Sequence, residues 1–121
     1  MVKTESSQKL KTGQKAPDFN LIGIDGKLYS LNDFNSKTIL IIFICNHCPF
    51  VKARIKDIID LQSDFTKDEL RIVGINSNDP NYEEEGIENM KKFSKEYNLN
   101  FPYLIDETQE IAKTYGAVCT P

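Results

Sequence analysis

Long apolar runs are missing from this sequence. The longest, Ile39 to Ile44, is far shorter than the roughly 20 residues with which a helix spans a bilayer. The opening segment, Met1 to Gln14, carries several charges with no apolar stretch behind them, which argues against a secretory signal. We therefore expect no membrane partner and a cytoplasmic location.

A dominant charge of one sign is missing as well. The 15 lysines and arginines and the 18 aspartates and glutamates are spread along the whole chain and give a net charge of -3. Such a chain has no sustained basic field of the kind that attracts phosphate backbones. Nucleic acid is therefore not an expected partner.

Cysteine is scarce, because the chain of 121 residues has only 3. An odd number of thiols in a reducing compartment is not typical of a disulfide framework. The length and the hydrophobic content of 40% suit one globular domain with one core. Reactive or metal-binding thiols are therefore the features that point to function.

The pattern predicts a flexible tail over residues 1–12 and a single domain over residues 13–121. Phe19 to Ile24 and Lys27 to Leu31 are apolar-rich runs on either side of Asp25-Gly26. An Asp-Gly pair between two such runs is typical of a hairpin turn. The domain should therefore open with a small β-hairpin.

The middle of the chain predicts a strand followed by a helix. Thr38 to Cys45 is a continuous run of β-branched and aromatic residues, which indicates a central strand covered on both faces. Pro49 fits the first turn of the helix, where its missing N–H breaks no hydrogen bond. Apolar residues then recur at spacings of three and four, at Val51, Ile55, Ile58, Ile59 and Phe65.

The rest of the chain repeats this alternation. Leu70 to Ile75 predicts a second buried strand and Phe101 to Ile105 a short third one. Helices are predicted from the spacing of Ile87, Met90, Phe93 and Tyr97, and from Thr108 to Tyr115, which Gly116 closes. The order indicates an α/β fold, in which sites form at the carboxyl ends of strands. Cys45 and Asn76 both fall at such ends.

Cys45 and Cys48 lie at the predicted junction of a strand and a helix. Two thiols separated by two residues can close a disulfide ring with little backbone movement. Because a helix N-terminus favours a thiolate, we expect a lowered pKa and a nucleophilic role for Cys45, with Cys48 as the resolving thiol. His47 would stabilise the Cys45 thiolate further and make the disulfide more oxidising.

Metal binding is the main alternative for this pair. A zinc site needs two more ligands, and the chain offers only Cys119 and His47. His47 lies between the two cysteines, where it would struggle to reach the same ion, so zinc is the weaker interpretation. A c-type haem site needs histidine directly after the second cysteine, and Pro49 stands there instead.

Several segments resemble the AhpC/TSA (redoxin) branch of the thioredoxin superfamily. They are Gly13-Gln14-Lys15-Ala16-Pro17-Asp18-Phe19, Asp25-Gly26-Lys27, Cys45-Asn46-His47-Cys48-Pro49-Phe50 and Tyr115-Gly116-Ala117-Val118-Cys119-Thr120-Pro121. The resemblance implies a thioredoxin-like fold, a central mixed sheet flanked by helices, that exchanges disulfides with protein or small-molecule thiols and needs no dissociable cofactor. It also implies a cis-proline at Pro121, which with Thr120, Asn46 and Pro49 would bind the substrate.

The resemblance also extends to peroxidases, which supply a second hypothesis with hydroperoxides as substrates. Peroxidases of the family have proline seven residues, and threonine or serine three residues, before the reactive cysteine. If Cys48 takes that role, Ile41 and Cys45 stand in those places, so we rank disulfide exchange first. Many thioredoxins carry a buried acid six residues before the first cysteine, where Ile39 stands, and this leaves the proton acceptor for Cys48 unassigned.

The family fold continues past the cis-proline with a strand hairpin and a final helix, whereas this sequence stops at Pro121. We expect an incomplete sheet with an exposed edge, through which an oligomer could form. An inactive fragment or a non-enzymatic metal binder is the third hypothesis. Two interpretations of Cys119 are equally supported, a third redox thiol and a small packed residue. The acidic stretch Asp79 to Glu85 precedes a predicted helix, and we interpret it as offsetting the helix dipole.

Overall fold

The computed structural model describes residues 10–81 and 85–117. Most of the predicted tail lies outside the described residues. So do Cys119, Thr120 and Pro121, together with part of the acidic stretch that begins at Asp79. The roles predicted for Cys119, Thr120 and Pro121 therefore stay predictions.

The described residues form one mixed sheet with strand order β2-β1-β5-β4-β3. The elements in chain order are β1 (Asn20–Gly23), β2 (Leu28–Ser30), β3 (Thr38–Phe43), α1 (Pro49–Asp64), β4 (Leu70–Asn76), α2 (Ile87–Tyr97), β5 (Tyr103–Ile105) and α3 (Glu110–Tyr115). β3, β4 and β5 run parallel, whereas β1 pairs antiparallel with β5 and β2. The predicted α/β class is confirmed.

The hairpin predicted around Asp25-Gly26 is formed by β1 and β2. Gly26 has a φ of 79°, in the left-handed region that glycine adopts at little cost. The Asp25 carboxylate accepts a hydrogen bond from the backbone N–H of Lys27 at 3.1 Å, which closes the turn. The local sequence therefore determines this turn.

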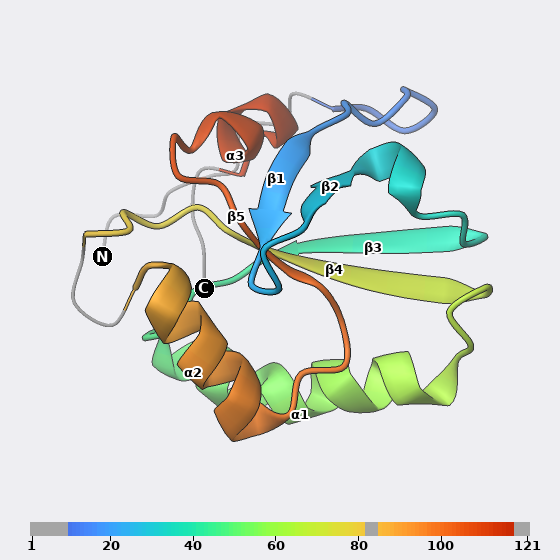
Figure 1. Ribbon diagram of the computed structural model, residues 1–121. Coiled ribbons are helices and arrows are strands. Elements are labelled where there is room, and N and C mark those ends of the chain that lie inside the picture. Colours follow the sequence, from blue (N-terminus) through green and yellow to red (C-terminus); the bar gives the residue numbers. More distant parts are fainter. Residues whose placement is uncertain (1–9, 82–84, 118–121) are drawn as a thin grey trace, which may run out of the picture.

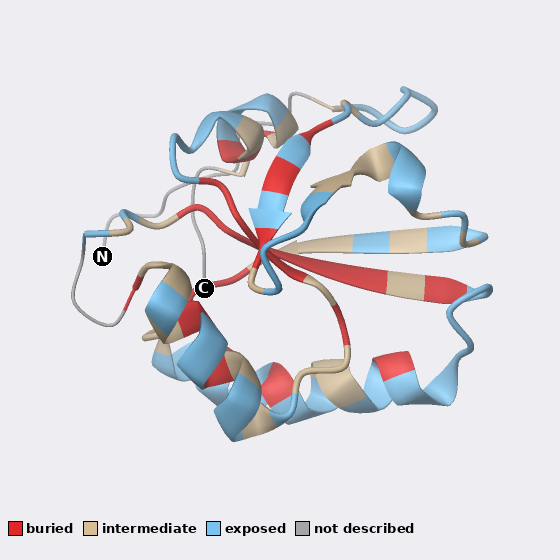
Figure 2. Cartoon of the chain, in the orientation of Figure 1, coloured by how far each residue is buried: buried red, intermediate tan, exposed pale blue. Residues whose placement is uncertain are grey.

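The prediction that β3 is a central strand is wrong. This strand lies at the edge of the described sheet rather than at its centre, and none of its residues is fully buried. β4 is the strand that is covered on both faces, and it is buried along almost its whole length (Figure 2). A continuous apolar run fits both positions, because it fixes the strand conformation and not the number of neighbours.

Helices cover both faces of the sheet. α1 and α2 lie on one face and α3 lies on the other (Figure 1). The core under α1 and α2 includes Val51, Ile55, Ile72, Met90, Phe93 and Tyr103. The core on the opposite face includes Phe19, Leu21, Val73, Ile75 and Leu104. Phe65 was predicted in the buried stripe of the first helix but is 45% exposed, because α1 ends at Asp64 and the backbone of Phe65 is extended.

The parallel pairing of β3 and β4 positions the candidate site. Phe43 pairs with Ile75, and the N–H of Ile44 donates to the Ile75 carbonyl at 3.0 Å. Cys45 and Asn76 therefore leave the sheet side by side at its carboxyl edge, as predicted. Among the residues that the structure describes, no helix has the length and apolar character needed to cross a membrane.

Candidate active site

The Cys45–Cys48 segment connects β3 to α1. Pro49 occupies the first turn of the helix, and Cys48 is the N-cap residue. The N–H of Lys52 donates to the Cys48 carbonyl at 3.1 Å, as expected at the start of a helix. Cys48 rather than Cys45 therefore stands at the positive end of the helix dipole.

The two thiols hydrogen-bond to each other but differ in exposure. Cys45 is 2% exposed, whereas Cys48 is half-buried. Burial raises the pKa of Cys45 to about 11; a hydrogen bond from the Cys48 backbone works against this rise, and the charge of Glu85 adds to it. The lowered pKa predicted for Cys45 is therefore wrong. The helix begins after the second cysteine, and the first cysteine lies inside the protein.

Glu85 brings a buried carboxylate to this segment from a distant part of the chain. It is 2% exposed, and it accepts hydrogen bonds from the backbone N–H groups of Asn46 and His47 at 3.1 Å each. The amide of Asn76 donates to it at 2.8 Å. The carboxylate therefore fixes the backbone between the two cysteines.

The loop that carries Glu85 is shaped by Gly86. Gly86 has a φ of 90°, and a side chain there would lie 2.8 Å from the Pro80 carbonyl oxygen. α2 begins after it, and the acid of its first turn is Glu88. Dipole compensation by the stretch from Asp79 stays a prediction, but the Glu85 carboxylate has partners outside that helix that this interpretation did not include.

His47 faces the same carboxylate. Its Nδ1 contacts the Glu85 carboxylate, and its side chain is 30% exposed, so it joins the buried acid to the surface. The Cys45 sulfur, a ring nitrogen of His47 and a Glu85 oxygen all lie within 4.8 Å of one another. These three groups could exchange a proton or hold a metal ion. Cys48 is not part of this group, so the paired-cysteine zinc site weighed from the sequence stays untested, and the group is a different set of ligands.

Comparisons with known proteins show the family of this chain. The profile of the AhpC/TSA family matches residues 12–121. The chain belongs to the AhpC/TSA family. It is 27% identical over 114 residues to the thiol-disulfide oxidoreductase ResA of Bacillus thuringiensis subsp. konkukian, covering 94% of this chain and 62% of that protein. It is 32% identical over 116 residues to the chloroplastic peroxiredoxin Q of Populus jackii, covering 95% and 51%.

Solved structures confirm the fold of this AhpC/TSA protein. An uncharacterized conserved protein of Geobacillus kaustophilus is 47% identical, with a TM-score of 0.84 over 90% of this chain and 59% of that one. The thioredoxin domain of a thiol-disulfide oxidoreductase of Bacteroides vulgatus is 23% identical, with a TM-score of 0.76 over 93% and 78%. The fold is therefore thioredoxin-like, as the sequence predicts. The chain spans about three-fifths of the length of ResA.

In this AhpC/TSA protein, Asn46 and Tyr103 join Glu85 and Asn76 in one buried hydrogen-bond network. The Tyr103 hydroxyl donates to the Asn46 side-chain oxygen at 2.8 Å and accepts from the Asn76 amide at 3.1 Å. Asn46 is buried and its side chain supports the loop, while the substrate contact predicted for this residue stays a prediction. Pro49 is exposed beside Cys48, where a substrate contact stays a prediction.

Tyr103→Phe tests this support. We expect the free energy of unfolding to fall by about 1 to 3 kcal/mol, because two buried hydrogen bonds are lost while the ring remains. Tyr29→Phe is the matched control: its hydroxyl bonds to Asp25 on the exposed hairpin, and its loss should cost less than about 0.5 kcal/mol. Urea denaturation measures both, and equal effects would contradict the assigned support.

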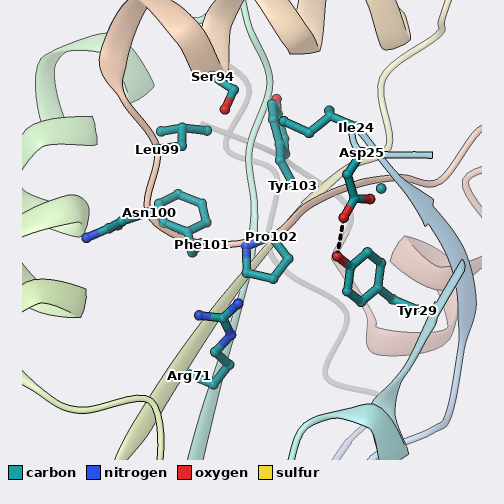
Figure 3. Close-up of a pocket in the computed structure, with 11 residues that line it drawn as sticks. Ile24, Asp25, Tyr29, Arg71, Ser94, Leu99, Asn100, Phe101, Pro102 and Tyr103 are labelled. Carbon is teal, nitrogen blue, oxygen red and sulfur yellow. Dashed lines mark hydrogen bonds between the residues drawn. The ribbon is translucent and has the colours of Figure 1, made fainter. Parts of the chain in front are cut away.

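A pocket of about 240 Å³ lies on the other side of Tyr103 (Figure 3). It is at the amino edge of the parallel strands, because Arg71 stands near the start of β4 and Pro102 just before β5. The cysteines leave β3 at the opposite edge. This pocket is therefore not the thiol site, although the Tyr103 ring lines it while the Tyr103 hydroxyl reaches Asn46.

Proposed function

We propose that this protein exchanges disulfides with thiol partners, with Cys48 as the attacking thiol and Cys45 as the resolving thiol. The observation that carries the proposal is the pair of hydrogen-bonded free thiols at the start of α1, one half-buried and one buried. This order reverses the one predicted from the sequence. A substrate reaches Cys48 more readily, and the helix dipole favours negative charge there.

The first step uses the accessible sulfur. The Cys48 thiolate attacks one sulfur of a substrate disulfide, forms a mixed disulfide and releases the other substrate sulfur as a thiolate. Phe50 follows in the first turn of α1 and is 60% exposed, which offers an apolar contact to a partner beside the reactive sulfur. A protein or small-molecule disulfide with apolar flanks fits this surface.

The second step uses the buried sulfur. Cys45 loses its proton and attacks the Cys48 sulfur, which closes the disulfide and releases the second substrate thiolate. Two electrons thereby pass from the protein to the substrate. The Glu85–His47 pair lies within 4.8 Å of the Cys45 sulfur and is the proposed acceptor of its proton. It takes the place of the buried acid that the sequence lacks at Ile39.

A redox titration of the full chain with glutathione tests this function. We expect one reversible intramolecular disulfide, which mass analysis after alkylation locates at Cys45 and Cys48. Cys45→Ser should trap a mixed disulfide on Cys48, because the resolving thiol is gone. Cys48→Ser should trap far less, because the remaining thiol is buried and has a raised pKa.

Cys119→Ser is the control, and it should retain the disulfide. Trapping on Cys45 in the Cys48→Ser variant, without trapping on Cys48 in the other, would restore the order predicted from the sequence. A chain that forms no disulfide between the two residues at any potential would refute the function.

Peroxide reduction is a second candidate, favoured by one specific contact. Cys45 stands three residues before Cys48, where family peroxidases have threonine or serine, and its side chain hydrogen-bonds to Cys48. The Cys48 thiolate would take one oxygen from a hydroperoxide and release an alcohol. Cys45 would then condense with the sulfenic acid to form the disulfide and water. Stopped-flow oxidation by a hydroperoxide, much faster than that of a free thiol, would favour this candidate.

A further inference from the structure

A thiol, an imidazole and a carboxylate converge beside the resolving cysteine. The Cys45 sulfur, a ring nitrogen of His47 and a Glu85 oxygen lie within 4.8 Å of one another, and two of the three side chains are buried. Sulfur, imidazole nitrogen and carboxylate oxygen are the ligand types that Zn²⁺ takes in proteins. Three protein ligands with an open fourth position are typical of zinc sites that keep a place for water or substrate.

We propose that the reduced protein binds a Zn²⁺-class ion through Cys45, His47 and Glu85. The ion takes the place of the direct contact between His47 Nδ1 and the Glu85 carboxylate. Cys45 gives up its proton on binding, and its thiolate and the carboxylate balance the two positive charges. The ligands thereby neutralise the buried ion. This matters because an unpaired charge in low-dielectric surroundings costs much free energy.

The surroundings of Glu85 already hold this ligand in place. The Asn76 amide and the backbone N–H groups of Asn46 and His47 bond to the carboxylate, and these bonds do not involve the Cys45 sulfur. Hydrogen bonds of this kind orient a carboxylate ligand before the ion arrives. Cys48 lies outside the ligand group, so this is not the paired-cysteine knuckle considered from the sequence.

The same sulfur cannot bind the ion and form a disulfide. Binding is therefore restricted to the reduced protein. Because the bound ion occupies the thiol that resolves the mixed disulfide, it should stop the second step and leave the substrate on Cys48. This consequence, unlike the binding itself, rests on the proposed function. The site would couple the availability of Zn²⁺ to the redox state of the pair.

A Co²⁺ titration of the reduced full chain, without chelator, tests the binding. We expect one equivalent to give the intense near-ultraviolet absorption of a cobalt–thiolate bond, and Zn²⁺ to displace it. Cys45→Ser should remove that absorption. His47→Gln and Glu85→Gln should each weaken the affinity for Co²⁺ by at least roughly 10- to 100-fold. This is the loss that is typical when a residue that only supports a metal ligand is changed.

Cys48→Ser is the matched control, because it removes the neighbouring thiol and leaves all three ligands. It should bind Co²⁺ with unchanged stoichiometry and within about threefold of the wild-type affinity. Loss of binding in this variant as large as in Cys45→Ser would overturn the ligand set. Binding of Co²⁺ to the oxidised protein with the same thiolate absorption would overturn the redox restriction.

Far-ultraviolet circular dichroism of each variant shows whether it is folded. His47→Gln carries the test if Glu85→Gln is not, because His47 is the most exposed of the three ligands. The glutathione titration in the presence of a chelator examines the proposed function separately. A redox-active protein that binds no Co²⁺ when reduced would refute the metal site and leave the function standing.

Discussion

Glu85→Ala lowers the free energy of unfolding by about 3 to 5 kcal/mol, the range for breaking a buried charged network. The cause is the loss of one acceptor that serves donors of Asn46, His47 and Asn76 at once. Each buried donor that loses its acceptor costs about 1 to 3 kcal/mol. The midpoint of urea denaturation, at an unchanged slope, measures this loss.

Glu88→Ala is the control for this change. Glu88 is also acidic and lies near Glu85 in the chain, but its side chain is 77% exposed and pairs with Lys91 on the surface of α2. Its loss should cost less than about 1 kcal/mol. A Glu85→Ala variant as stable as the Glu88→Ala variant would show that the carboxylate does not hold the cysteine segment.

Much of the fold follows from local patterns in the sequence. The Asp25-Gly26 pair fixes a hairpin because the turn requires positive φ. The spacing of Met90 and Phe93 fixes the buried face of α2, and Pro49 marks the first turn of α1. Each of these predictions depends on residues that are close together in the chain.

The site could be predicted only in part. The spacing of Cys45 and Cys48 indicates thiol-disulfide chemistry. The exposure of each sulfur depends instead on where the helix begins and on which residues cover the sulfur. Glu85 lies 39 residues from Asn46, and nothing local separates it from the acids before it. The sequence offers one weak indication of Glu85, which is the last acid of that stretch and directly precedes Gly86. A glycine there suits an ordered loop, and its φ is indeed positive.

The edge position of β3 was missed for a related reason. An apolar run such as Ile39 to Phe43 indicates a strand with two apolar faces, and residues on both faces of β3 do contact the core. The number of strands beside it is a property of the topology. The same limit applies to the two thiols, whose proposed order of attack rests on burial rather than on order in the chain.

We expect Cys45 in the Cys48→Ser variant, where burial still raises its pKa, to react with iodoacetamide at pH 8 roughly 10- to 100-fold more slowly than it does in the unfolded chain. The thiolate is the reacting form, and burial raises the pKa of Cys45 from 9.0 to about 11. Two pKa units correspond to about a hundredfold smaller thiolate fraction at this pH. Poor access to the buried sulfur can only slow the reaction further. Alkylation followed by mass analysis of the Cys45 peptide measures the rate.

The raised pKa also fixes how stability depends on pH. A folded-state pKa above the unfolded value means that the contribution of Cys45 is complete below pH 9 and is lost as the pH rises towards 11. Cys45→Ser should therefore lose less stability between these pH values than the wild type does. Tyr103 and Tyr115, whose pKa values are also raised chiefly by burial, remain in both proteins, and only the smaller effect of the Cys45 charge on the pKa of Tyr103 differs between them. Parallel stability curves, or rapid alkylation of Cys45 at pH 8 in the folded protein, would show that this thiol ionises as an exposed one does. Cys45 would then no longer need Glu85 and His47 to take its proton.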